Sequence, residues 1–349
     1  MRSNQRIRIA VISVIILSGI SFWIMTRNHE GTIRKELFDF AITDTGAVTK
    51  IYMVSTAGKE ITLEKVKPGE WTVNGKYKAR NDAARNLLIC MKELQVRNPV
   101  AKSATENISK QMATTSTKVE IYQNDKLIKM YYVGNDTQDG LGTYMLLNDI
   151  ETGENSTLPF IMFIPGFNGF LSVRYFTEED LWRDRTVFGF FPDQIASISV
   201  DYTHLMDSSF SISLTNSNLI SLADCKGHNI TDFDTLKAKQ YINYFSSVQY
   251  EALKNDLRPA FWDSVLATGA VHLITLKDRA GKSHVVKTFS KPADPNKTDP
   301  VTGKPDNEDL ERMFALINDD KDIVVIQYFV FGKLLPSPSY FKKIQGTKK

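Results

Sequence analysis

One short segment of this 349-residue chain gathers side chains whose types suit hydrolytic chemistry. It carries four carboxylates and two guanidinium groups: Glu178, Glu179, Asp180, Arg183, Asp184 and Arg185. Glycoside hydrolysis needs two carboxyl groups that face each other across a cleft at roughly 5 to 10 Å. Adjacent residues of one short segment rarely face a shared cleft, so a hydrolase built on Asp180 and Asp184 is the weakest hypothesis. We expect Arg183, Asp184 and Arg185 to be structural residues, joined in an ion pair that fixes the segment.

Other patterns that support catalysis or metal binding are incomplete. The histidines are scattered, and only His272 and His284 fall on neighbouring predicted strands, without a third zinc ligand. In the acidic stretch that begins at Asp294, a calcium-binding loop would need glycine where Asp299 stands and glutamate where Pro305 stands. We interpret that stretch as a solvated loop. The sequence therefore predicts no catalytic residue, no cofactor and no metal ion.

The two cysteines, Cys90 and Cys225, exclude the dense disulfide framework that is typical of small secreted domains. Cys90 falls within a helical pattern, where a small buried hydrophobic residue is expected. A single disulfide between the two remains open at this point. Neither cysteine lies near a histidine in a pattern typical of a nucleophile, and the sequence has no Gly-x-Ser-x-Gly motif.

An aromatic connector, residues 167–192, is the candidate for binding a partner. It contains eight aromatic residues: Phe167, Phe170, Tyr175, Phe176, Trp182, Phe188, Phe190 and Phe191. Rings at this density are expected to be covered, either in a core that joins the two halves of the chain or by a bound partner. For partner binding we single out Phe167, Phe170, Tyr175 and Trp182. Exposed sheet edges offer a second way of docking.

The elements that must position these residues occur twice along the chain. In residues 44–166, and again in 193–341, β-branched and aromatic strands precede a helical pattern and further strands follow it. The clearest match joins residues 143–149 to 312–319, and an insertion at 291–308 lengthens the second block. The order predicts an α+β fold, in which two similar repeats of antiparallel sheet are packed with helices.

The amino terminus predicts a membrane anchor. Residues 9–25 are almost all apolar, and at 1.5 Å per residue a helix there would span roughly 25 Å. Arg2, Arg6 and Arg8 precede this run, which places the amino terminus in the cytoplasm. A cleaved signal peptide is the alternative, but bulky residues 22–25 stand where small residues should precede a cut. We therefore expect an uncleaved signal anchor in a bacterial inner membrane.

This topology divides the chain into a cytoplasmic end with its anchor (1–27), a stalk (28–43) and a periplasmic body made of the two repeats and the connector. The four arginines before residue 28, a region without acids, account for more than the whole formal net charge of +3. The composition therefore excludes a basic nucleic-acid-binding domain. The expected partners are the inner membrane and an envelope protein.

Several motifs resemble an uncharacterised bacterial membrane-anchored family, domain of unknown function 4340, in its gliding-bacteria form. The resemblance rests on Leu181-Trp-Arg-Asp-Arg185, on residues 38–44, and on Tyr132-Val-Gly134 with Gly142-Thr-Tyr-Met145. Members of that family are similar to segments found beside or within gliding-motility proteins associated with ABC transporters. The resemblance implies a role in the cell envelope and names no reaction.

Three functions from different classes follow from these observations. The favoured one is a non-enzymatic, membrane-anchored envelope scaffold or accessory subunit, such as a component of an ABC-transporter-associated, gliding or secretion machine. The second is a glycan- or peptide-binding module that uses Phe170, Tyr175 and Trp182 as a platform in a concave pocket. The third is the hydrolase, in which the carboxyl groups of Asp180 and Asp184 would converge across a cleft.

Overall fold

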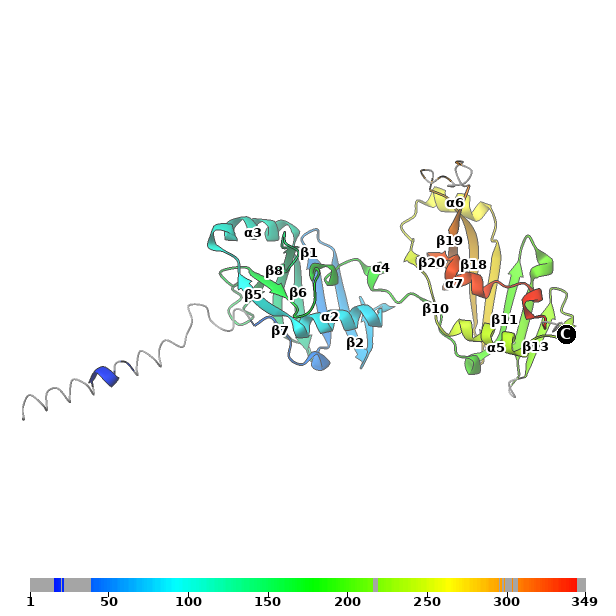
Figure 1. Cartoon of the computed structure of the whole chain (residues 1–349), viewed down its shortest axis with the longest axis horizontal. Helices are drawn as coiled ribbons and strands as arrows, with labels where there is room; N and C mark the ends of the chain where they lie inside the picture. Colours follow the sequence, from blue (N-terminus) through cyan, green and yellow to red (C-terminus); the bar gives the residue numbers. More distant parts are fainter. Residues whose placement is uncertain are drawn as a thin grey trace, which may run out of the picture. The chain divides into compact units, whose positions relative to one another are not determined.

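Two compact units, Met1–Asp184 and Arg185–Lys349, make up the chain in a computed structural model (Figure 1). The structure describes residues 16–19, 21, 39–215, 219–294, 296, 298, 303 and 307–343. The boundary between the units falls inside the aromatic connector, after Asp184. Residues 167–184 of the connector therefore belong to the first unit, and residues 185–192 belong to the second.

One large antiparallel sheet forms the first unit. Its strands are β1 (Lys50–Ser55), β2 (Glu60–Lys67), β3 (Glu70–Val73), β4 (Tyr77–Lys78), β5 (Gln95–Pro99), β6 (Thr117–Gln123), β7 (Lys126–Asp136), β8 (Thr143–Asn148) and β9 (Phe160–Phe163). They pair in the order β4-β3-β2-β1-β6-β7-β8-β9-β5. Residues two apart share a face of a strand, so Ile51 and Met53 of β1 are both buried against the core.

Two helices pack on opposite faces of this sheet. Leu87 and Met91 of α2 (Asn81–Glu93) share the main core with Tyr131 of β7. The next residue of that strand, Tyr132, packs instead against the cluster formed by α3 (Lys102–Thr115). Because neighbouring strand residues point to opposite faces, α2 and α3 must cover different sides of the sheet. β5 connects them by running along the far edge beside β9.

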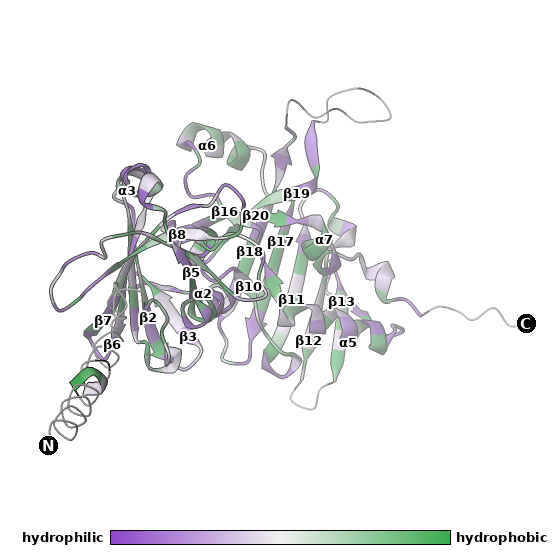
Figure 2. Cartoon of the chain, turned by 60° about the vertical axis from the view of Figure 1, so that its left-hand side comes forward, coloured by the Kyte–Doolittle hydropathy of each residue, from purple (hydrophilic) through white to green (hydrophobic). Residues whose placement is uncertain are grey.

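The second unit has the same construction. Its large sheet consists of β11 (Ile195–Tyr202), β12 (Phe210–Leu214), β13 (Ile220–Asp224), β14 (Asn229–Ile230), β16 (Ala252–Leu253), β17 (His272–Asp278), β18 (Ser283–Pro292), β19 (Glu308–Ile317) and β20 (Asp322–Gln327). The order is β14-β13-β12-β11-β17-β18-β19-β20-β16. Two short strands, β10 (Thr186–Phe188) and β15 (Val248–Gln249), pair separately. Hydrophobic residues concentrate on the strands of both units, and the connecting loops are mostly hydrophilic (Figure 2).

Helices again cover both faces in the second unit. Tyr241 and Ile242 of α5 (Thr235–Asn243) belong to its main core. Trp262 and Val265 of α6 (Pro259–Ala267) form a separate cluster with Phe289 and other residues of the opposite face. A short helix, α7 (Tyr328–Phe331), follows β20.

Strand for strand, the two sheets are the same. β1 to β4 correspond to β11 to β14, β6 to β9 correspond to β17 to β20, and β5 corresponds to β16. The predicted match of residues 143–149 with 312–319 falls on β8 and β19, which hold equivalent places in the two orders. The predicted α+β class and the two similar repeats of antiparallel sheet are confirmed.

The predicted membrane anchor, residues 9–25, lies outside the described residues apart from 16–19 and 21, which are helical. Residues 28–38 of the predicted stalk also lie outside them. Within the part of the chain that the structure describes, no helix is both long enough and apolar enough to cross a membrane.

Candidate functional site

The acidic segment, which suggested a hydrolase, is fixed to the first sheet through its carboxylates. An Asp184 Oδ2 atom lies 3.0 Å from Nζ of Lys78 in β4. Glu179 Oε2 accepts a hydrogen bond of 2.7 Å from Nδ2 of Asn74, which follows β3. Asp180 is an exposed residue of the short helix α4 (Glu179–Trp182). The Glu179 and Asp184 carboxylates therefore anchor the segment at β3 and β4, so the geometry supports a structural role for it.

The two arginines of this segment lie in different units. Arg183 is 7% exposed, and its guanidinium carbon lies 3.8 Å from the centre of the Tyr77 ring, a cation–π contact. Arg185 begins the second unit, where its carbonyl accepts a hydrogen bond from the Tyr250 amide. Its Nε atom is buried and has no hydrogen-bond partner among the described residues. Arg183 is therefore held in the first unit by its side chain, and Arg185 is joined to the second unit through its backbone carbonyl.

The structure separates the four aromatic residues predicted to bind a partner. Tyr175 and Trp182 are 2% and 0% exposed and belong to the first core. Burial holds the pKa of the Tyr175 hydroxyl well above its usual value. Phe167 and Phe170 are exposed, and Arg174 lies 4.3 Å from the centre of the Phe167 ring. Of the predicted three-ring platform, only Phe170 is therefore at the surface.

The later rings of the connector join the second unit. Phe188 is fully buried, with its ring centre 5.2 Å from that of Phe245. Phe190 packs against His284 at 4.6 Å. Phe191 is 61% exposed, the most exposed ring of the connector. The connector therefore contributes aromatic side chains to two separate cores.

The histidines and cysteines show no metal or disulfide chemistry in the described residues. His272 Nδ1 lies 2.8 Å from the Thr288 hydroxyl, and His284 Nε2 lies 3.1 Å from an Asp278 carboxylate oxygen. No group of three or more His, Cys, Asp or Glu side chains that could hold a metal ion is found there. Both cysteine thiols are free, one buried in the first unit and the other exposed in the second.

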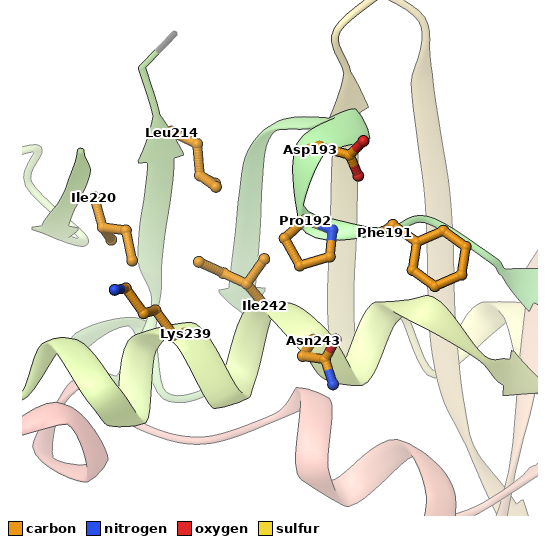
Figure 3. A pocket seen from close by; sticks show the side chains of 8 residues that line it. All are labelled: Phe191, Pro192, Asp193, Leu214, Ile220, Lys239, Ile242 and Asn243. Carbon is orange, nitrogen blue, oxygen red and sulfur yellow. The ribbon is translucent and has the colours of Figure 1, made fainter. Parts of the chain in front are cut away.

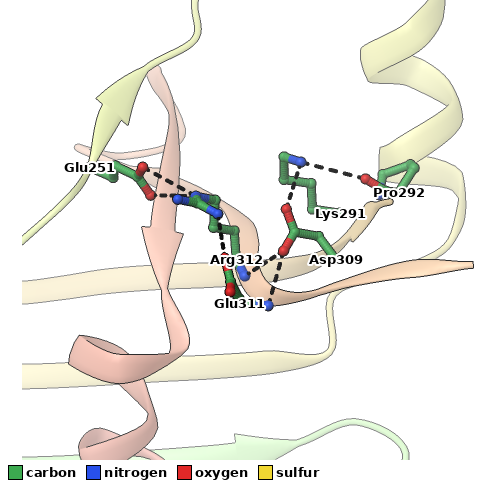
Figure 4. A network of polar contacts seen from close by, with 6 residues as sticks. All are labelled: Glu251, Lys291, Pro292, Asp309, Glu311 and Arg312. Atoms are coloured by element: carbon green, nitrogen blue, oxygen red, sulfur yellow. Dashed lines mark hydrogen bonds and ion pairs between the residues drawn. The ribbon is translucent and has the colours of Figure 1, made fainter. Parts of the chain in front are cut away.

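A charged network lies at the base of the insertion in the second unit (Figure 4). Arg312 Nε donates to both carboxylate oxygens of Glu251, at 3.1 and 2.8 Å, while Nη1 donates to Glu311. Lys291 Nζ lies 2.9 Å from Asp309. The hydrogen bond from Arg312 lowers the pKa of Glu251 below its usual value. Because each cation faces a carboxylate, the network can hold β18 to β19 and can hold β19 to the residue before β16.

An apolar groove of about 690 Å³ lies in the second unit (Figure 3). Three segments far apart in the sequence form it: the turn η4 (Pro192–Gln194), the facing ends of β12 and β13, and helix α5. Its lining residues are Phe191, Pro192, Asp193, Leu214, Ile220, Lys239, Ile242 and Asn243.

Packing explains the shape of this groove. Ile242 of α5 is buried and forms its floor, and Leu214 and Ile220 are partly buried where their strands end. The Phe191 amide donates to the Gln194 side chain at 2.8 Å, which holds η4 in its turn. Asp193, Lys239 and Asn243 also line the groove, and the Lys239 side chain reaches toward Ile220 while the Asp193 and Asn243 side chains point away from Ile242 (Figure 3). An apolar floor with a few polar groups around it is typical of a binding site.

Sequence reasoning did not predict the groove. Phe191 belongs to the predicted aromatic connector, but no motif or spacing in the sequence indicates the other lining residues. A scan against protein-family models, a search of curated proteins and a search of solved structures each find no match to this chain. The resemblance to domain of unknown function 4340 therefore remains a prediction that rests on the motifs quoted above. The fold and groove describe a duplicated α+β protein with a concave apolar site in its second unit.

Proposed function

We propose that this chain is a non-enzymatic, membrane-anchored scaffold or accessory subunit of the bacterial envelope, and that it binds another protein through its second unit. The observation that carries the proposal is the groove, whose apolar floor opens beside an exposed Phe191. Protein interfaces combine an apolar centre with a polar rim and are enriched in aromatic residues. Asp193, Lys239 and Asn243 supply such a rim.

The envelope setting of the proposal comes from the sequence. The apolar run at residues 9–25, preceded by three arginines, supports an inner-membrane anchor with the two units in the periplasm. The resemblance to domain of unknown function 4340 supports association with a transporter or with a gliding or secretion machine. On this proposal the two units present their surfaces close to the membrane.

A peptide-binding module is the second candidate function, and the same groove favours it. Its volume of about 690 Å³ lies within the range of roughly 300 to 1,000 Å³ that is usual for ligand pockets. The aromatic platform of the connector gives this candidate less support, because Tyr175 and Trp182 are buried.

Site-specific photo-crosslinking in native membranes tests the proposed binding surface. We expect a benzophenone amino acid at position Phe191, on the groove, to trap a discrete envelope protein. The same probe at Leu205, which is 64% exposed in the same unit and does not line the groove, should trap none. If position 191 gives no adduct and the full chain purifies alone as a monomer, the scaffold proposal fails.

Protease protection tests the proposed topology. In spheroplasts, we expect an added protease to degrade both units, while a tag fused before Arg2 stays protected. A chain lacking residues 1–27 should leave the membrane fraction, because the apolar run that holds it there has been removed. Protection of the two units in intact spheroplasts would contradict the proposed orientation.

A further inference from the structure

The register of the two sheets allows their residues to be matched one to one. Leu63 of β2 lies opposite Val73 of β3, and Ile212 of β12 lies opposite Leu222 of β13. All four side chains are buried in the core of their unit. In each unit this pair also occupies the same place relative to the first strand, with Leu63 opposite Ile51 and Ile212 opposite its counterpart in β11.

Two residues further along, on the same face, the repeats differ. In the first unit Lys65 lies opposite Trp71, and in the second unit Leu214 lies opposite Ile220. Trp71 and Ile220 therefore hold equivalent positions, and so do Lys65 and Leu214. Both residues of the second pair line the apolar groove.

The first unit fills this position with its own tryptophan. Trp71 is only 3% exposed and belongs to the first core. The Lys65 ammonium lies 5.4 Å from the centre of the indole ring and donates a hydrogen bond to the Gly46 carbonyl. Gly46 belongs to the turn η2 (Thr45–Ala47), which precedes β1 as η4 precedes β11 and packs against α2. Strand pair, turn and helix thus enclose an indole.

The second unit keeps the same frame but has a smaller side chain inside it. Isoleucine replaces the indole, and among the described residues the space bounded by η4, α5 and the ends of β12 and β13 is open. As Lys65 does in the first unit, Lys239 of α5 supplies a cation, because it lines the groove (Figure 3). Asp193 on η4 adds a carboxylate, which can accept a hydrogen bond.

We propose that this groove receives a tryptophan side chain from a partner protein, at the position that Trp71 fills in the first unit. The inference rests on the proposed binding function and names the feature of the partner that is recognised. Leu214, Ile220 and Ile242 cover the body of the indole, and the Lys239 ammonium attracts its π face. A volume of about 690 Å³ also leaves room for the flanking residues of the partner.

Peptide binding to the full chain in lipid nanodiscs tests this proposal. The probe is a fluorescein-labelled peptide, Gly-Ser-Gly-Trp-Gly-Ser, followed by fluorescence anisotropy. We expect it to bind about 30-fold more tightly than the same peptide with alanine or leucine in place of tryptophan, because buried tryptophans dominate interface affinity. Equal affinity for the tryptophan and leucine peptides would overturn the proposal.

Variants of the groove provide the matched comparison. Ile220→Trp, and the double variant Leu214→Lys with Ile220→Trp, rebuild the closed arrangement of the first unit and should reduce binding of the tryptophan peptide at least about tenfold. Lys239→Glu keeps the groove open, removes the cation and should also weaken binding. Leu236→Ala changes an exposed apolar residue of the same helix that does not line the groove, so binding should be unchanged.

The outcomes separate this inference from the proposed function. If the crosslink at position 191 traps a protein but Ile220→Trp leaves both adduct and peptide binding intact, the tryptophan site is wrong and the scaffold proposal stands. If Ile220→Trp abolishes both while the variant unfolds at the same urea concentration as the wild type, the inference is supported. If the variant is unfolded, the Lys239→Glu result decides, because that exposed substitution leaves the core unchanged.

Discussion

Replacing Trp182 by alanine is expected to lower the free energy of unfolding of the first unit by about 3–5 kcal/mol. The indole is fully buried and stacks on Phe176, with ring centres 4.2 Å apart. Its Nε1 donates to the Phe176 carbonyl, and the backbone carbonyl of Trp182 accepts from the amide of Arg80 at the start of α2. Truncation leaves a cavity between the connector and the first core.

The measurement is a urea series with pulsed hydrogen exchange, followed in peptides of α2 and β7 so that the first unit is observed by itself. Leu181→Ala is the matched control, because the neighbouring side chain is 38% exposed and its loss should cost less than about 1 kcal/mol. If Trp182→Ala left the first unit as stable as the control and instead abolished an envelope crosslink, Trp182 would be a partner-binding residue and not a core residue.

The repeat could be predicted because its signals are local. β-Branched and aromatic residues mark strands, and the spacing of Ala84, Leu87 and Met91 marks one face of α2, which is the face that the structure buries. The predicted order of strands and helices does not depend on the exact residues at which each element begins and ends. Similar residues at 143–149 and 312–319 therefore identified equivalent strands without any knowledge of the sheet.

The edge strands and some helix ends could not be predicted from local signals. β5 is almost wholly exposed and β16 has only two residues, so pairing with β9 and β20 alone defines them. The helix α2 begins after its N-cap Arg80, and no side chain caps it, although Asn81 and Asp82 are residue types that favour a cap. The Arg80 amide is satisfied by the distant Trp182 carbonyl, a tertiary contact that local sequence does not encode.

The candidate site was beyond prediction for a similar reason. Its lining comes from residues 191–193, from the ends of β12 and β13 and from α5, which only the folded sheet brings together. The contrast between Trp71 and Ile220 becomes visible once strand register pairs Trp71 with Lys65 and Ile220 with Leu214, because the residue types themselves are dissimilar. The aromatic connector could not be assigned correctly for the same reason. It is one continuous stretch in the sequence, but the fold divides its rings between two cores at Asp184.

Acid is expected to destabilise the second unit through His272, a residue for which the first unit has no titrating equivalent. His272 lies between Tyr202 of β11 and Thr288 of β18 and is 8% exposed. Burial lowers the pKa of its imidazole from 6.5 to about 4, because the charged form would lose its hydration. In the first sheet the position equivalent to His272 is Thr117, which lies opposite Val133.

The sign of the effect follows from proton binding. Between pH 6.5 and about 4 the unfolded chain takes up a proton at His272 and the folded chain does not, so stability falls as the pH falls. The difference in pKa corresponds to a loss of about 3 kcal/mol in the free energy of unfolding of the second unit. This loss is complete once the pH has fallen to about 4. The neighbouring Asp201 acts in the opposite sense above pH 3.8, because burial raises the pKa of its carboxyl group.

The double variant His272→Thr with Thr288→Val places the non-titrating pair of the first unit in the second and leaves Asp201 unchanged. We expect the urea midpoint of the second unit, followed by pulsed hydrogen exchange in β17 and β18, to fall steeply below pH 6.5 in the wild type. In the variant the urea midpoint should fall less steeply with decreasing pH, because the contribution of His272 to the pH dependence has been removed. This difference in steepness is expected whatever the stability of the variant at pH 7.5. Parallel pH profiles would mean that His272 gains a proton within the folded unit, so that the imidazole is hydrated and the strands around it open more readily than their burial indicates.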